Sequence, residues 1–126
     1  MQRGFSLIEL VIALAIVAIL TAIALPSYAA YMRKSVRADA QAYITDAANR
    51  QQQYLADRRA YAGSMSALNM ALPATLSGKY TFAVVAADGP PPTFTITGTA
   101  TGDQVHDPCP TLTLDSAGNR LPATCW

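Results

Sequence analysis

The sequence predicts an α+β fold in which a long N-terminal helix, transmembrane in its first half, packs against a small antiparallel β-sheet. Three observations lead to this expectation: an apolar run over residues 5–25, a helical stripe of apolar residues over 36–55, and alternating apolar residues from 80 onward. A sheet with one apolar face must be covered by another element. The amphipathic part of the helix is the element that can cover it.

Composition narrows the classes of protein that the chain can represent. The 126 residues are 52% hydrophobic and 13% charged, whereas about a quarter of a usual sequence is charged. Such a chain folds, and its net charge of +1 provides no strong field for steering a polyanion. Two cysteines and one histidine exclude a disulfide-rich scaffold, a four-cysteine zinc site and a multi-histidine centre. We therefore expect no metal and no cofactor, and the length excludes a large multidomain enzyme.

Residues 5–25 form the most distinctive segment. They hold one charged residue, Glu9, and two hydroxyl residues, Ser6 and Thr21. As a helix the segment is about 31 Å long, which is enough to cross the hydrocarbon core of a bilayer. A helix that is apolar on every side requires lipid or a dense helical bundle around it.

Three interpretations of this segment are open on the residues alone. A cleaved signal peptide fits the basic Arg3, the apolar core and the small residues near Ala29. A plain membrane anchor fits the length. The third interpretation assigns a specific use to Glu9, the only glutamate in the chain. A carboxylate near the centre of a membrane helix costs about 2.5–3.5 kcal/mol, and an intramembrane acid is by default functional.

The N-terminal motif resembles a known family. The run Gly4-Phe5-Ser6-Leu7-Ile8-Glu9-Leu10, followed by the apolar stretch and Pro26, is similar to the N-terminus of type IV pilins. The basic Arg3 before Gly4 also matches, and the similarity continues through residues 24–28. Cys109 and Cys125 near the end of the chain add a looser resemblance, which is to small minor pilins.

The resemblance implies a processing and assembly pathway. Residues 1–4 would be a leader peptide that a prepilin peptidase removes between Gly4 and Phe5, with methylation of the new Phe5 amine. Glu9 would pair with the N-terminal amine of a neighbouring subunit and so set axial register. The implied partners are other pilin subunits, the peptidase and an inner-membrane assembly platform. The chain would reside in the inner membrane before it enters an extracellular pilus, with roles such as adhesion and twitching motility.

Residues 26–57 are expected to be an amphipathic half of the same helix. Pro26 either ends the helix or bends it, and the pattern beyond it favours continuation. The cluster Arg33, Lys34 and Arg37 is expected to be solvated or to contact lipid headgroups. The apolar stripe consists of Val36, Ala40, Tyr43, Ile44, Ala47, Tyr54 and Leu55.

Residues 58–126 are expected to hold a loop and the sheet. Residues 58–79 form the loop, with one helical turn near 65–70, and strands follow at 80–86, 94–100, about 112–114 and after a turn at 115–119. Cys109 and Cys125 either close a disulfide loop or stay as free thiols. Because persistent disulfides form outside the cytosol, the bonded alternative places this part in the periplasm or outside the cell.

These features favour a structural pilus subunit, most similar to a minor pilin, over an exported enzyme. The sequence contains no nucleophile motif, and the pair His106-Asp107 is expected to lie in a solvated loop. A pseudopilin of type II secretion and a DNA-uptake or adhesion pilin stay open as alternatives. Four scattered basic residues either serve solubility or form a DNA-facing patch; they are Arg58, Arg59, Lys79 and Arg120.

Overall fold

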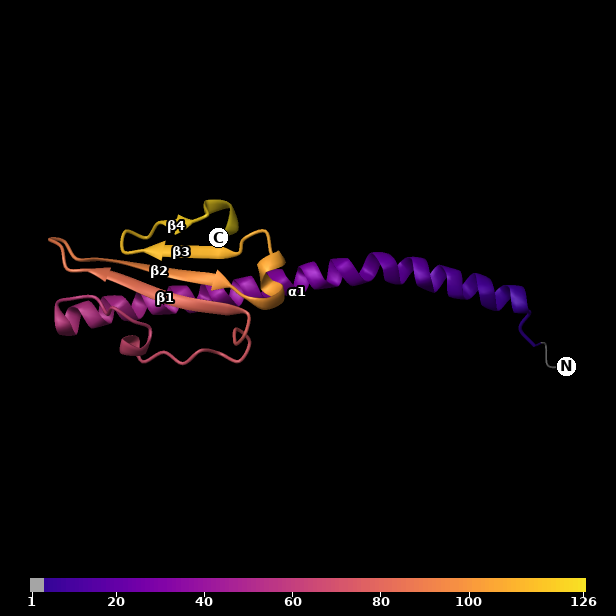
Figure 1. The fold of residues 1–126 in the computed structure, drawn as a ribbon, viewed down its shortest axis with the longest axis horizontal. Helices are drawn as coiled ribbons and strands as arrows, with labels where there is room; N and C mark the ends of the chain where they lie inside the picture. Colours follow the sequence, from indigo (N-terminus) through magenta and orange to yellow (C-terminus); the bar gives the residue numbers. More distant parts are fainter. Residues whose placement is uncertain (1–3) are drawn as a thin grey trace. The chain divides into compact units, whose positions relative to one another are not determined.

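The computed structural model describes residues 4–126, and Figure 1 shows the ribbon of the chain. The chain divides into two compact units, the first ending at Met32 and the second spanning Arg33–Trp126. The helix α1, Leu7–Arg58, contributes to both units. The second unit also holds a four-stranded antiparallel sheet. The predicted α+β fold, a long helix with a small antiparallel sheet packed on it, is confirmed.

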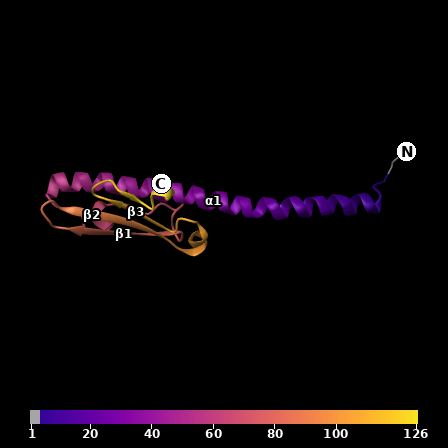
Figure 2. The ribbon, with the colours of Figure 1, turned by 90° about the horizontal axis from the view of Figure 1, so that it is seen from above.

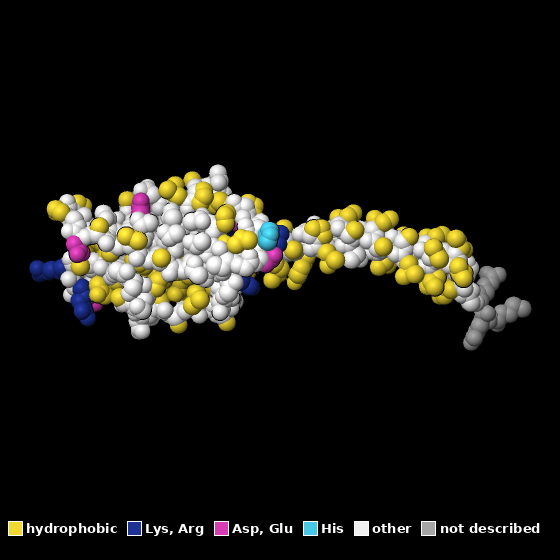
Figure 3. Space-filling model, in the orientation of Figure 1, with side chains coloured by type: hydrophobic (Ala, Val, Ile, Leu, Met, Phe, Trp, Pro, Cys, Tyr) yellow, Lys and Arg dark blue, Asp and Glu magenta, His cyan; other side chains and the backbone are white. Residues whose placement is uncertain are grey.

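The first half of α1 carries its apolar side chains on the surface. From Leu7 to Leu25 every residue is exposed, and hydrophobic atoms cover this part of the helix in Figure 3. Pro26 lies inside α1, which continues to Arg58, so Pro26 does not end the helix. Two hydroxyl residues of this region bond back to the helix: Thr21 donates to the Val17 carbonyl at 2.7 Å, and Ser27, which follows Pro26, donates to the Ile23 carbonyl at 3.2 Å.

The second half of α1 buries one face. The buried positions follow a spacing of four, four, three and four residues, which is one stripe of a helix; they are Val36, Ala40, Ile44, Ala47 and Gln51. The predicted stripe is therefore correct in its buried aliphatic members. Gln51 was not predicted, although it follows Ala47 by one helical turn.

The sheet is a meander in which sequential strands pair. Its strands are β1 (Tyr80–Ala87), β2 (Thr93–Ala100), β3 (Thr111–Asp115) and β4 (Arg120–Leu121), in that spatial order. Short 3₁₀ turns occupy Ser66–Leu68, Gly102–His106 and Ala123–Cys125. Figure 2 shows β1, β2 and β3 lying along the second half of α1. Alternate residues of β2 are buried and the intervening threonines face outward, as the sequence pattern predicts.

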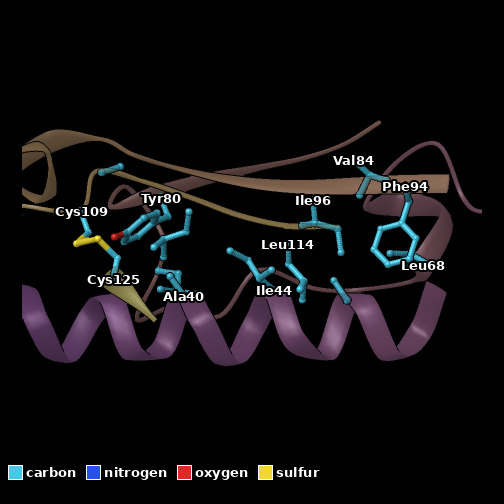
Figure 4. Close-up of a cluster of buried hydrophobic side chains, with 14 of the residues drawn as sticks. Ala40, Ile44, Leu68, Tyr80, Val84, Phe94, Ile96, Cys109, Leu114 and Cys125 are labelled. Atoms are coloured by element: carbon cyan, nitrogen blue, oxygen red, sulfur yellow. A yellow bond between two sulfur atoms is a disulfide. The ribbon is translucent and has the colours of Figure 1, made fainter. Parts of the chain in front are cut away.

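The core fills the space between α1 and the inner face of the sheet (Figure 4). Ile44 on the helix and Ile96 on β2 are fully buried. Gly98 permits the close approach of the two layers, because a Cβ at this position would lie 3.0 Å from both Ile44 Cδ1 and Phe82 Cε1. Tyr43 contacts Phe82 with ring centroids 4.6 Å apart, so this tyrosine of α1 has a packing role.

The loop after α1 is attached to the helix by a buried polar side chain. Gln51 donates from Nε2 to the Ala62 carbonyl at 2.8 Å and accepts the Ala62 N–H on Oε1 at the same distance. Tyr61 meets Phe94 edge to face at 4.7 Å between centroids. The helical turn expected near residues 65–70 is the 3₁₀ turn Ser66–Leu68.

Cys109 and Cys125 are joined by a disulfide, with their Cα atoms 5.9 Å apart. The bond encloses β3 and β4. Closing a loop of this length contributes about 3 kcal/mol in the chain-entropy description of disulfides. The short C-terminal strands therefore depend on a covalent link as well as on their pairing.

Candidate assembly site

The predicted cleavage position is accessible. Gly4 is exposed, and a Cβ added there would meet nothing within 4 Å. The Phe5 side chain is 88% exposed. Residues 1–3 of the predicted leader, including Arg3, lie outside the described residues. A bond between two exposed residues at the start of a helix offers a protease an open backbone.

Glu9 has a local hydrogen-bonding partner, Ser6, at the start of the helix. Its Oε2 accepts the Ser6 backbone N–H at 3.4 Å, while the Ser6 hydroxyl accepts the Glu9 N–H at 3.5 Å. This reciprocal arrangement is a capping box, which satisfies two free N–H groups at a helix start. The spacing Ser-x-x-Glu was the available sequence signal. Among residues 4–126, no cation lies within 4 Å of the Glu9 carboxylate.

The apolar half of α1 is a surface that needs a partner. Within residues 4–126, α1 is the one helix long and apolar enough to cross a membrane, and its apolar window has no buried residue. Large side chains such as Leu14, Ile19 and Ile23 are about 60% exposed. An apolar surface of this extent marks a site for lipid or for other apolar helices.

Polar contacts tie the start of the second unit's helix to residues 103–107. Arg37 Nη1 lies 2.8 Å from Asp107 Oδ1, and Arg33 Nη1 lies 3.2 Å from Asp103 Oδ2. Gln104 Nε2 donates to the Arg33 carbonyl at 2.9 Å. The Asp107 side chain is 2% exposed, and its carboxylate also accepts the Cys109 N–H.

These contacts correct two expectations from the sequence. Asp107 lies in the interior and pairs with Arg37, so the expectation of a solvated His106-Asp107 loop is wrong for Asp107. The cluster after the apolar segment is not uniformly solvated either, because Arg33 and Arg37 are engaged in ion pairs. Residue periodicity carries no information about an ion pair whose members are 70 positions apart.

Burial also raises the pKa of two tyrosines in this unit. For Tyr80 the main cause is desolvation, partly offset by a hydrogen bond from Gln104. Desolvation is likewise the main cause of the raised pKa of Tyr43, and Arg50 acts in the opposite direction. Both phenols are therefore neutral at physiological pH and serve as packing groups.

The four scattered basic residues do not gather into one patch. The Lys79 carbonyl accepts the Thr101 N–H, next to the segment that is bonded to Arg33. Arg58 lies 25 residues further along α1, which is about 37 Å of helix. Arg120 stacks over the Trp126 ring at 5.2 Å. Lys79 and Arg58 therefore lie near opposite ends of the part of α1 that belongs to the second unit, and the four basic residues do not form one compact patch.

Metal ligands are likewise not assembled in the described structure. Among residues 4–126, no three His, Cys, Asp or Glu side chains lie close enough to hold a metal ion.

An amphipathic helix against an antiparallel meander, with an apolar helical extension and a disulfide-closed C-terminal segment, defines the class of filament-forming pilins. Comparison with known families makes the assignment specific. The chain belongs to the family described as "Type IV minor pilin ComP, DNA uptake sequence receptor", which matches residues 26–113. The prokaryotic N-terminal methylation motif matches residues 1–25.

Individual relatives agree with this assignment. Fimbrial protein EcpC of Eikenella corrodens is 35% identical over 94% of this chain and 76% of its own length. The type IV wide pilus major component PilA4 of Thermus thermophilus is 36% identical over a segment that covers 68% of this chain and 65% of that protein. A solved type IV pilin from Shewanella oneidensis has a TM-score of 0.60 at 30% identity, covering 75% of this chain and 97% of that one.

The chain is thus a structural subunit of a type IV pilus, of the minor-pilin kind, and it assembles with other pilin subunits. The comparisons favour a pilus subunit over a secretion pseudopilin. Its apolar N-terminal helix indicates membrane anchoring before assembly.

Proposed function

We propose that the chain is cleaved between Gly4 and Phe5, methylated on the Phe5 amine, held in the inner membrane by residues 5–25, and then drawn into the filament through the same segment. The observation that carries the proposal is an apolar helical surface, entirely exposed, with one carboxylate near its start. Lipid covers that surface first and neighbouring pilin helices cover it afterwards. The role is structural, without catalysis.

Glu9 guides the transfer between these two environments. In lipid its carboxylate is costly, and the capping box with Ser6 leaves part of its hydrogen-bonding capacity unused. A neighbouring subunit's Phe5 amine supplies an opposite charge in a medium of low dielectric, where a closely paired charge is strongly attracted. One axial position of the incoming subunit satisfies this pairing, so Glu9 sets register.

The disulfide supports the orientation in which residues 33–126 are periplasmic before assembly. A bond between Cys109 and Cys125 persists in an oxidising compartment. The assembly platform in the inner membrane and the prepilin peptidase then act at the opposite end of the chain, on residues 1–25.

The capping box makes it possible to separate the charge of Glu9 from its local structural role. Glu9→Gln retains a side chain that can accept the Ser6 N–H but removes the charge. Ser6→Ala retains the charge but removes half of the capping box. If Glu9 sets register, Glu9→Gln is lost from sheared filaments while Ser6→Ala enters them. The measurement is the amount of this subunit in the membrane fraction and in sheared filaments, by quantitative immunoblot.

Protease resistance of residues 33–126 in periplasmic extracts controls for folding. Wild-type levels of Glu9→Gln in filaments would contradict the register role. Loss of both variants would show that the helix start, and not the charge, is what assembly requires. Mass analysis of the mature N-terminus tests processing separately, since an ordinary signal peptidase would leave a chain that begins after the apolar segment.

A second candidate function is DNA reception, which is favoured by the family match over residues 26–113. The basic side chains are spread over the second unit, so we expect contacts mainly to phosphates and a steep loss of affinity with salt. Electrophoretic mobility shifts with duplex DNA at rising salt test this. A Kd that does not change with salt would contradict phosphate-dominated binding, and no shift at low salt would remove the candidate.

A further inference from the structure

A groove of about 290 Å³ lies between the first turns of the second unit's helix and the end of the chain. Lys34, Arg37 and Gln41 line it from α1, while Thr124 and Trp126 line it from the C-terminal segment. All of these residues belong to the second unit.

The groove is held open by fixed contacts. Gln41 Nε2 donates to the Cys125 carbonyl, and Cys125 is itself held by the disulfide. The Trp126 indole N–H donates to the Leu121 carbonyl at 3.2 Å, and the Arg120 guanidinium lies 5.2 Å from the centre of the Trp126 ring. Both walls therefore have defined positions.

The three basic residues at the start of this unit differ in whether they form ion pairs. Arg33 and Arg37 are paired with Asp103 and Asp107, so those four charges balance. Lys34 is exposed, and within residues 4–126 it takes part in no ion pair. Three of the residues that line the groove carry hydrogen-bond donors: Lys34 has an ammonium, Arg37 has guanidinium N–H groups beyond the one bonded to Asp107, and Thr124 has a hydroxyl. These are the donors that bind a phosphate group.

The short segment between the apolar run and Lys34 limits how far the groove can lie from a membrane. Lys34 follows Leu25, the last residue of the apolar run, by nine positions. Nine residues span about 13 Å as a helix and at most about 32 Å when extended. Tyr28 and Tyr31, 65% and 69% exposed, lie between the two, and such aromatic residues mark the headgroup level of a bilayer. The tether therefore keeps Lys34 within reach of lipid headgroups.

We propose that this groove binds the phosphate of an anionic phospholipid headgroup while the subunit resides in the membrane, with Lys34 as the charged contact and Trp126 beside the glycerol part. The proposal rests on the membrane stage of the proposed function. It assigns Lys34 a function that ends when the subunit leaves the bilayer, since a filament core contains no headgroup layer.

The single tryptophan of the chain reports directly on the groove. The processed full-length chain is reconstituted in phosphatidylcholine vesicles that contain a lipid with a nitroxide on its headgroup and a rising fraction of phosphatidylglycerol. Quenching of Trp126 fluorescence is expected to rise with phosphatidylglycerol and to saturate. Lys34→Gln is expected to weaken this dependence about fivefold, the effect of one basic residue near a charged surface.

Lys79→Gln is the matched control, because Lys79 is the only other lysine of the chain, is exposed, and lies outside the groove. The proposal would be overturned if both variants weakened the phosphatidylglycerol dependence equally, or if quenching did not change with the phosphatidylglycerol fraction. A Lys34-dependent response to a short DNA duplex without one to phosphatidylglycerol would assign the groove to nucleic acid instead. Flotation with neutral vesicles tests the membrane stage on its own, since failure to insert would contradict the proposed function and not the chemistry of the groove.

Discussion

The two halves of α1 differ in what surrounds them, although they belong to one helix. Ile16 in the first half is 53% exposed and Ile44 in the second is fully buried. The first half is apolar on every side, whereas the second buries one stripe and exposes polar residues such as Asn49 and Gln53. The first half is therefore a surface to be covered by lipid or other subunits, and the second is the core of a folded unit.

The difference shows that the distribution of apolar residues around a helix predicts what will cover that helix. A stripe of apolar residues can be satisfied by one sheet within the same chain, but a helix that is apolar all round cannot. Burial within the chain stabilises the second unit alone, and burial of the first half becomes available only in a membrane or a filament. Stability and assembly should accordingly respond to different residues.

The largest expected difference in stability is between alanine substitutions at Ile44 and at Ile16. Ile44→Ala should lower the free energy of unfolding of the second unit by about 2–5 kcal/mol, because it removes buried methyl groups and leaves a cavity. Ile16→Ala should leave that free energy unchanged. Denaturant unfolding of the full chain in detergent, followed by Trp126 fluorescence, measures both. Equal losses would mean that the halves are not energetically distinct.

A second comparison is between two ion pairs on neighbouring turns. Arg37→Gln leaves the Asp107 carboxylate, 2% exposed, without its counter-charge, and removing one partner of a buried pair costs about 3–5 kcal/mol. Arg33→Gln should cost less than about 1 kcal/mol, because Asp103 is 77% exposed. Thermal unfolding at neutral pH compares the variants. A small effect for Arg37→Gln would show that water reaches Asp107.

The buried amide provides a third test, with a neighbouring glutamine as its control. Gln51→Leu removes both hydrogen bonds to Ala62 and leaves a buried N–H and a buried carbonyl unsatisfied, for which we expect a loss of about 2 kcal/mol. Gln53→Leu, on the exposed face, should change stability by less than about 0.5 kcal/mol. Hydrogen exchange of the Ala62 amide should accelerate in Gln51→Leu only.

The smallest expected effect concerns the β3–β4 turn. Hydrogen bonds from the Asn119 side chain and backbone lower the pKa of Asp115 below its ordinary value of 3.8. Since the folded pKa is lower than the unfolded one, the ionised carboxylate adds stability above pH 3.8, and this contribution disappears as the pH falls through the lowered value. Asp115→Asn should therefore reduce stability slightly at neutral pH and not below the folded pKa. NMR titration of the Asp115 carboxyl carbon checks the direction of the shift.

Prediction from sequence was most successful where a pattern is local. The alternation in residues 80–86 and 94–100 predicted β1 and β2, because side-chain direction in a strand has a period of two. The helical period predicted the burial of Val36, Ala40, Ile44 and Ala47. It missed Gln51 because an amide is not counted as apolar, although the structure places its side chain between helix and loop with both polar atoms bonded.

The candidate site likewise has some features that local sequence spacing predicts and others that it cannot predict. Gly4, Phe5 and Glu9 were predicted to act in processing and assembly, and those roles stay predictions, since they concern other molecules. The Ser6–Glu9 capping box was within reach of the sequence, because its members are three residues apart. The groove at Lys34 and Trp126 was not, because its walls come from opposite ends of the second unit.

The sequence by itself determined that this protein has an apolar helical segment with one acid, an amphipathic continuation and a threonine-faced antiparallel sheet, because each depends on the spacing of residues along one element. Only the tertiary structure decided which charges are free. Arg33 and Arg37 pair with carboxylates 70 positions away, whereas Lys34 pairs with none among residues 4–126. Gln51 bonds to a loop carbonyl 11 positions further along the chain. Such pairs depend on how elements pack against one another, and residue periodicity within an element does not encode that packing.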